Sequence, residues 1–234
     1  MRRLVFPQLL RLPAMGVLVA ATMMAAGPAA AGPGFAPHTW GGPHSNAKSN
    51  WGGYAAAGSA GKYTTIKGNW TEPVTKCTAT HDLAAPWLGL DGYGTETVEQ
   101  TGVQVACNTG KPVYSGWYEM YPASPVYFSN PVSAGDKFQA SVTSGSGHAY
   151  TLVLQDLTKG WKHTIHKTLG SAKNASAEAV IEAPGGYPNF PNGVSFTGVT
   201  VNGHPLAFYK PTKLDSGPYV PGPLNGGTFT IKRG

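Results

Sequence analysis

The sequence predicts an all-β protein, an antiparallel β-sandwich of two large sheets. Short runs of alternating apolar and polar residues recur from residue 49 onward, and turn signals such as Asp91-Gly92 and Asn202-Gly203 separate them. No window combines the caps and the period of a long helix. Glycine makes up 32 of the 234 residues, about twice its usual share. Many short strands in about 200 residues favour one sandwich or barrel domain.

The first 31 residues have the pattern of a secretory signal peptide. Arg2 and Arg3 precede an apolar stretch over 13–26, and the small residues of 29–31 form a cleavage site. This apolar stretch is too short to span a bilayer. We therefore expect a secreted, extracellular protein with no membrane association after removal of residues 1–31. Residues 32–48, rich in Gly, Pro and His, are expected to be a flexible leader or short propeptide before a single domain over 49–234.

Export also changes the charge balance. Removing Arg2, Arg3 and Arg11 from the 17 basic residues leaves 14 against 11 acidic ones, a net charge of +3. The remaining basic residues are scattered and have no interleaved aromatic residues, which excludes a nucleic-acid footprint. Charged residues are only 12% of the chain, so little self-repulsion develops when carboxylates are protonated. This composition favours an acidic habitat.

The ordered domain is expected to begin at 50–54. The following strands are expected over 63–70, 87–91, 98–105, 113–121, 137–142, 150–156, 161–167, 177–183, 194–201 and 228–232. In these runs successive side chains point to opposite faces of a sheet, so alternation assigns each residue to one face. The Pro- and Gly-rich stretch 211–225 is expected to form a long loop or an edge segment.

Cys77 and Cys107 are the two cysteines of the chain. In an oxidising compartment an even pair most simply forms one disulfide. It would close a loop of about 30 residues and stabilise the fold by about 3 kcal/mol. The histidines are dispersed and no pair stands near the cysteines, so no metal or other cofactor is expected.

Three neighbouring strands each place a polar side chain beside aromatic residues or glycines. Asp91 shares a face with Trp87, Gln100 lies in the next strand, and Glu119 shares a face with Tyr121. This arrangement suits a groove floored by a sheet better than a dry core. A sandwich with two apolar inner faces and ordinary wet outer faces would scatter polar groups in the same way.

The stretch 177–183 carries two glutamates on one face, Glu178 and Glu182. Acidic residues are depleted in strands, so their presence needs a reason. An edge strand protected by charge would explain Glu178 as readily as catalysis does. Glu182 lies just before a loop that begins Pro184-Gly185-Gly186, where a strand would open into a site.

Four motifs follow one another along the chain: SNWGGY at 49–54, WLGLDG at 87–92 with QTG at 100–102, WYEMYP at 117–122 and AEAVIE at 177–182. In this order and spacing they resemble the glutamic peptidases, the eqolisin family of secreted, acid-acting endopeptidases. The resemblance covers roughly 49–201. It implies a sandwich of two large antiparallel sheets similar to the concanavalin A-like jelly rolls.

The resemblance implies a catalytic dyad of Gln100 and Glu182. It further implies five residues that support the dyad and line the cleft: Trp51, Trp87, Asp91, Glu119 and Tyr121. Gln104 stands where an aspartate can occur in the family, and Ala179 where an aromatic residue is usual. The surroundings of the dyad therefore depart from the family pattern.

The resemblance implies an acid protease that hydrolyses polypeptides and is insensitive to pepstatin, and we expect it to be a monomer. The residue types of the dyad suit this chemistry. A carboxylate can take a proton from water and later give it to the leaving amine. An amide can hold the water and donate to the developing oxyanion. Because the reference pKa of glutamate is about 4.3, an acidic working pH is expected.

Two other hypotheses remain open. One is a glycoside hydrolase that pairs Glu119 with Glu182 across an aromatic groove. The other is a non-catalytic sandwich that binds carbohydrate or peptide. Gln100 separates the classes, because a glycoside hydrolase needs two carboxyls and has no use for that amide.

Overall fold

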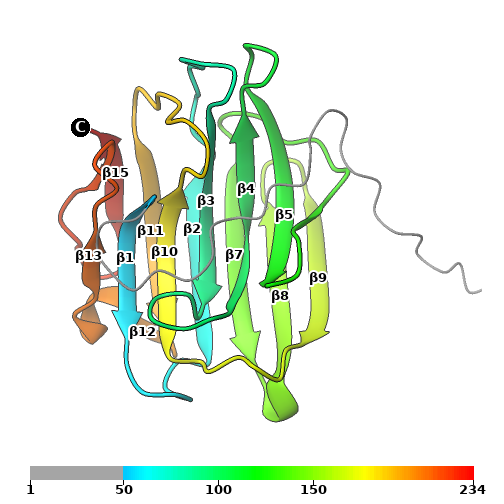
Figure 1. Ribbon diagram of the computed structural model, residues 1–234, viewed down its shortest axis with the longest axis vertical. Coiled ribbons are helices and arrows are strands. Elements are labelled where there is room, and N and C mark those ends of the chain that lie inside the picture. The colour runs from blue at the N-terminus through cyan, green and yellow to red at the C-terminus, as the bar shows by residue number, and fades with distance from the viewer. Residues whose placement is uncertain (1–49) are drawn as a thin grey trace, which may run out of the picture.

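The computed structural model describes residues 50–234, which form two antiparallel β-sheets packed face to face (Figure 1). The expected signal peptide over 1–31 and leader over 32–48 lie outside the described residues. The predicted fold class, an all-β sandwich of two large antiparallel sheets, is confirmed.

The first sheet has seven strands and carries the candidate site. Its order is β13-β1-β10-β3-β4-β5-β6. The strands are β1 (Trp51–Ala57), β3 (Leu83–Leu90), β4 (Val98–Ala106), β5 (Val113–Tyr121), β6 (Val126–Tyr127), β10 (Ser176–Glu182) and β13 (Thr212–Leu214).

The second sheet has eight strands, in the order β14-β15-β11-β2-β7-β8-β9 with β12 paired to β11. The strands are β2 (Thr65–Thr71), β7 (Lys137–Ser144), β8 (Ala149–Asp156), β9 (Trp161–Thr168), β11 (Val194–Val201), β12 (His204–Pro205), β14 (Tyr219–Pro221) and β15 (Phe229–Arg233). Two 3-10 helices, η1 (Ser146–His148) and η2 (Leu206–Tyr209), complete the described secondary structure.

The main hydrophobic core lies between the sheets. Leu88 and Ile181 enter it from the first sheet, and Phe138 and Leu152 from the second, and all four are fully buried. Burying each such side chain contributes about 1.5–3 kcal/mol. Apolar contact between the inner faces therefore holds the two sheets together.

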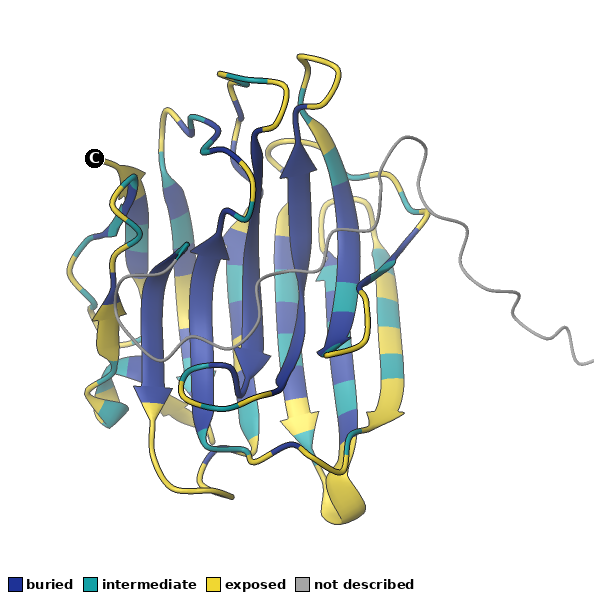
Figure 2. Ribbon diagram, in the orientation of Figure 1, coloured by how far each residue is buried: buried dark blue, intermediate teal, exposed yellow. Residues whose placement is uncertain are grey.

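The outer faces of the two sheets differ. In the second sheet, β7 and β8 alternate between buried and more exposed residues, as expected for a sheet with one wet face. In the first sheet, β3, β4 and β10 are buried along their whole length (Figure 2). A second apolar cluster that includes Trp51, Trp87 and Trp117 covers the outer face of the first sheet. The polar side chains of that face are thus surrounded by aromatic rings.

Two expectations about strands need correction. The strand expected over 87–91 begins four residues earlier, at Leu83, and includes Pro86. Proline is rare inside a central strand, which is why the pattern predicted a later start. The edge-strand explanation of Glu178 is wrong, because β10 lies between β1 and β3 in the sheet. The expectation for 211–225 is confirmed, since β13 and β14 are edge strands.

The predicted disulfide between Cys77 and Cys107 is present. It ties the segment before β3 to the end of β4, where the backbone N–H of Cys107 also donates to the carbonyl of Asp82 at 3.0 Å. Between residues 50 and 234, no helix is long and apolar enough to cross a membrane.

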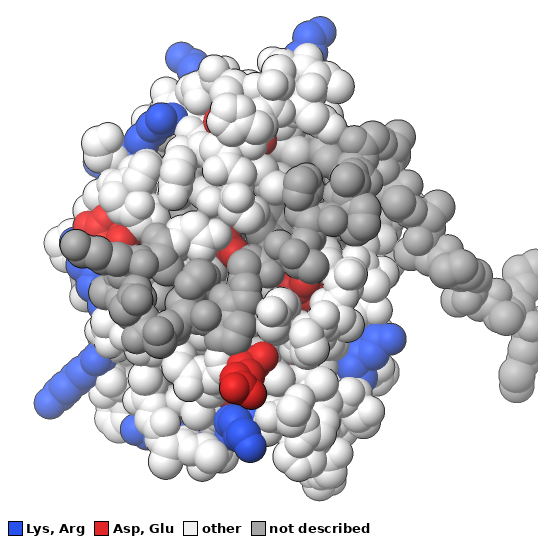
Figure 3. Space-filling model, in the orientation of Figure 1, with Lys and Arg blue, Asp and Glu red and all other residues white. Residues whose placement is uncertain are grey.

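Charge is divided between surface and interior. Nine of the 11 acidic residues are buried, and only Glu96 and Asp215 are exposed. Every lysine and arginine from residue 50 onward is exposed, and several lie around the rim of the view in Figure 3. Among the described residues a single ion pair occurs, between Lys159 and Asp136 at 2.6 Å. Most carboxyl groups of this protein therefore lie in its interior, and the basic side chains of the described residues lie on its surface.

Candidate active site

Strand pairing places the predicted dyad on one face of one sheet. Glu182 on β10 pairs with Ala85 on β3, and Gln100 on β4 pairs with Gly89 on β3. Because Ala85 and Gly89 are an even number of residues apart, all four residues belong to the outer face of the first sheet. Gln100 and Glu182 are separated by one intervening strand and by four positions along it.

The carboxyl group of Glu182 accepts hydrogen bonds from two N–H donors, one on β3 and one just before β1. The indole Nε1 of Trp87 donates to its Oε2 at 3.2 Å, and the amide Nδ2 of Asn50 donates to its Oε1 at 3.2 Å. Trp51 pairs with Glu182 across β1 and β10, and its ring meets the ring of Trp87 edge-on with centroids 4.8 Å apart. The carboxyl group is therefore fixed at both oxygens.

Gln100 is held by Glu119. These residues are directly opposite on β4 and β5, and Gln100 Nε2 donates to Glu119 Oε2 at 2.7 Å. Burial raises the pKa of Glu119 to about 9, and the nearby charge of Glu182 adds to this rise. Glu119 therefore keeps its proton in acid. Among residues 50–234, the Gln100 Oε1 has no hydrogen-bond partner, so this oxygen is available to a water or a substrate.

Glycines and Trp87 occupy the space between the two halves of the dyad. A Cβ at Gly89 would lie 2.8 Å from the Trp87 ring and 3.1 Å from the Cβ of Gln100. Glycine at this position thus admits both side chains. The indole Nε1 of Trp87 donates a hydrogen bond to Glu182, and the six-membered ring extends over Gly89 toward Gln100. The Trp87 side chain therefore lies between Glu182 and Gln100.

Asp91 has other partners than the dyad. It adopts a left-handed backbone with φ 62°. Its carboxylate accepts three backbone N–H groups, from Lys173, Asn174 and Ala175, at 2.7–2.8 Å. These bonds tie the end of β3 to the segment that leads into β10. Tyr121 ends β5 on the outer face and is half-buried beside the second apolar cluster.

The glycoside-hydrolase hypothesis requires Glu119 and Glu182 to act as a pair. Glu119 accepts a hydrogen bond from the Gln100 amide, for which that hypothesis has no use, and Glu182 accepts hydrogen bonds from Trp87 and Asn50. Within the described part of the chain, no group of three His, Cys, Asp or Glu residues could hold a metal ion.

Asn50 is a site residue that sequence reasoning missed. It stands next to Trp51 in the SNW motif, but only the tryptophan was assigned a role there. Nothing local to the strand that begins at Trp51 indicates that Asn50 reaches Glu182, 132 residues away in sequence. Pairing of β1 with β10 brings the two together.

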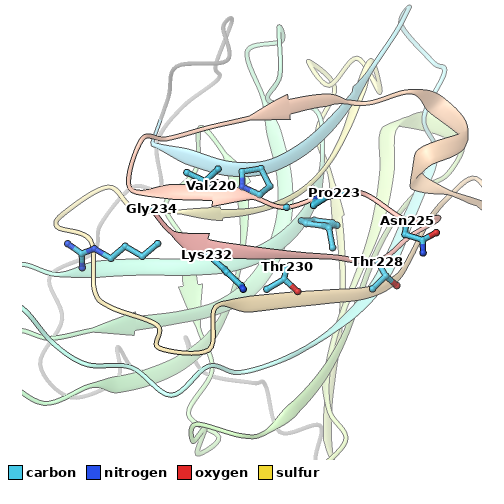
Figure 4. A pocket seen from close by; sticks show the side chains of 11 residues that line it. Val220, Pro223, Asn225, Thr228, Thr230, Lys232 and Gly234 are labelled. Carbon is cyan, nitrogen blue, oxygen red and sulfur yellow. The ribbon is translucent and has the colours of Figure 1, made fainter.

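Gln100, Glu119 and Glu182, which the sequence placed in a groove floored by a sheet, are fully buried. A cavity of about 680 Å³ lies elsewhere, beside β14 and β15, and Val220, Thr230 and Lys232 contribute to its lining (Figure 4). It contains none of the candidate catalytic residues.

Because several carboxyl groups are buried, we expect the protein to be most stable in acid. Burial raises the pKa of Glu99 to about 9, with a further contribution from Asp91, and burial also raises the pKa values of Glu72 and Glu178. A carboxyl whose pKa is higher in the folded state stabilises fully below its unfolded value near 4.5, and this stabilisation is lost as the pH rises. Ionisation of Glu99 alone costs about 3 kcal/mol by pH 7.

We therefore expect the free energy of unfolding to fall steeply from pH 4 to pH 7. Urea denaturation at several pH values measures it, with the Glu99→Gln variant as the matched comparison. This near-isosteric amide cannot ionise, so it should raise the free energy of unfolding at pH 7 and change it little at pH 4. Equal stability of the parent at both pH values would contradict the expectation.

The family model of the Peptidase A4 family matches residues 49–207. The chain belongs to the Peptidase A4 family. It is 32% identical to Scytalidopepsin B of Scytalidium lignicola over 140 residues, which are 58% of this chain and 52% of that relative. The chain thus spans about half the length of the curated relative it matches.

Solved structures of glutamic peptidases share the fold. Scytalido-glutamic peptidase with a peptide-based transition state analog is 25% identical, with a TM-score of 0.68 over 79% of this chain and 98% of that chain. The aspergilloglutamic peptidase from Aspergillus niger is 24% identical, with a TM-score of 0.57 over 64% of this chain and 98% of that chain. A third structure, a member of the Eqolisin family in complex with the tripeptide Ala-Ile-His, has a TM-score of 0.65 at 24% identity, over 79% of this chain and 98% of that chain.

Proposed function

We propose that this protein is an endopeptidase that hydrolyses polypeptides in acid with Gln100 and Glu182. The observation that carries the proposal is their shared placement. Both lie on the outer face of the first sheet, inside the region matched by the Peptidase A4 model, with Trp87 between them. The relatives whose structures contain a peptide-based analog or a tripeptide support polypeptides as the substrate class.

In the proposed mechanism one water lies between the two side chains. Gln100 Oε1 accepts a hydrogen bond from this water, and the Glu182 carboxylate takes its proton as it attacks the scissile carbonyl carbon. Gln100 has a second N–H besides the one given to Glu119, and this donor stabilises the oxyanion. Glu182 then gives its proton to the leaving amine. The reaction uses one ionising group, since an amide does not titrate.

Glu119 acts as a positioning residue in this scheme. Its pKa of about 9 keeps it protonated in acid. A neutral carboxyl accepts the Gln100 N–H through Oε2 without placing a second negative charge beside Glu182. The amide of Gln100 is thereby held with its oxygen turned away from Glu119.

We further propose that the protein is secreted after cleavage behind residue 31 and works as a monomer without a cofactor. The N-terminal pattern over 1–31 and the disulfide support export. N-terminal sequencing of protein recovered from the culture medium tests the cleavage point. A start at residue 1 would overturn it.

Acid digestion of a denatured protein tests the activity itself. We expect the purified protein to cut the unfolded substrate at internal peptide bonds near pH 3–4, with pepstatin present. We expect it to lose this activity toward neutral pH, because ionisation of its buried carboxyls destabilises the fold. Mass spectrometry of the products reads the cleavage sites. Release of sugars from polysaccharides without any peptide cleavage would instead favour the glycoside hydrolase.

A further inference from the structure

The side chain of Gln104 is paired at only one end. The hydroxyl of Tyr127 donates to Gln104 Oε1 at 2.6 Å. Gln104 is fully buried, and its Nε2 has no acceptor within hydrogen-bond distance among residues 50–234. Buried amides are nearly always satisfied, so this unpaired donor needs an explanation. A bound ligand that supplies an acceptor is one such explanation.

The position of Gln104 points to a substrate as that ligand. The pairs Ala84–Val105 and Trp87–Gly102 place Gln104 beside Ala85 on the outer face of the first sheet, and Ala85 pairs with Glu182. Gln104 and Glu182 therefore lie in one row across the sheet, two strand spacings or about 10 Å apart. The neighbours of Gln104 in this row are the small residues Ala85 and Ser115.

The bond from Tyr127 orients the amide. Tyr127 is on β6, beyond β5, so it holds the Gln104 oxygen toward that edge of the sheet. The nitrogen is the other branch of the same planar group, and neither of its two N–H groups has an acceptor among residues 50–234.

We propose that Gln104 sets substrate specificity by donating hydrogen bonds to an acceptor side chain of the peptide, Asp, Asn, Glu or Gln, within about three residues of the scissile bond. This inference rests on the proposed peptidase function. An extended peptide advances about 3.3 Å per residue, so a separation of about 10 Å corresponds to about three residues. A pure donor has nothing to offer lysine or arginine, which also carry no acceptor.

The test is a set of short peptides with one scissile bond. Each of the three residues on either side is varied in turn among asparagine, leucine and lysine, because asparagine and leucine are similar in shape and neither ionises. The parent is expected to cleave the asparagine peptide about tenfold more efficiently than the leucine peptide at one of these positions. The Gln104→Leu variant should lose that ratio through a change in KM.

Controls separate this inference from the proposed function. Gln155 is a half-buried glutamine on β8 in the second sheet, and Gln155→Leu should retain the parental profile. An asparagine preference that is absent in the parent, or that persists in Gln104→Leu, overturns the inference. Equal loss on all peptides in folded Gln104→Leu, checked by near-UV circular dichroism, also overturns it while leaving the peptidase intact. Parental cleavage by Glu182→Gln would instead overturn the proposed function.

Discussion

Replacing Glu182 by glutamine is expected to lower kcat/KM for peptide hydrolysis by about 10³-fold or more. In the proposed mechanism the Glu182 carboxyl takes the proton of the attacking water and then protonates the leaving amine. Such proton transfers contribute about 10²–10⁴-fold to the rate. Glutamine has nearly the same shape and can still bond to Trp87 and Asn50, so the fold should persist. Initial rates on one peptide at pH 3–4 measure the effect.

The matched control for this change is Glu178→Gln. Glu178 lies on the same face of the same strand, four residues before Glu182, and is also fully buried. Its variant should keep kcat/KM in acid within about threefold of the parent. If Glu182→Gln retained parental activity, or if both variants lost activity equally, Glu182 would not be the proton-transferring group.

Gln100→Ala is expected to lower kcat by about 10²–10³-fold with a smaller change in KM. Removal of one preorganised oxyanion donor costs this much in other hydrolytic sites. The variant also loses the oxygen that holds the water. Steady-state kinetics in acid, compared with Gln139→Ala in the second sheet, isolates the effect, because Gln139 is likewise a hydrogen-bonded glutamine, bonded to Asn69 at 2.9 Å.

Loss of the Gln100 partner leaves Glu119 buried with no hydrogen bond from Gln100. The folded state of Gln100→Ala must therefore be confirmed by near-UV circular dichroism before rates are compared. A folded Gln100→Ala that cleaves as fast as the parent would rule out the proposed role of this amide.

Local patterning was sufficient to predict the faces of most strands. Alternation over 98–105 correctly grouped Gln100 with Gln104 on one face of its strand, and alternation over 113–121 grouped Glu119 with Tyr121, since side chains in a strand alternate with a period of two. It was insufficient for β3, where the Ala-Ala-Pro segment before Trp87 has weak strand preference and tertiary burial decides the outcome.

Strand order could not be read from such patterns. Glu178 was open to an edge-strand interpretation because the sequence does not say that β1 and β3 flank β10. The bonds from Asn50 and Trp87 to Glu182, and from Gln100 to Glu119, likewise depend on register between strands. The motif resemblance led to Gln100 and Glu182, whereas the one-sided pairing of Gln104 became visible only with side chains in place.

The most direct measurement of whether one amide and one acid act on the same water is a double-mutant cycle. It compares kcat/KM of the parent, Glu182→Gln, Gln100→Ala and the double variant on one peptide at one acid pH. Residues that act as a unit are strongly non-additive, so the double variant should be no slower than the slower single variant. Losses that multiply in the double variant would show that the two residues act independently and would contradict a shared water.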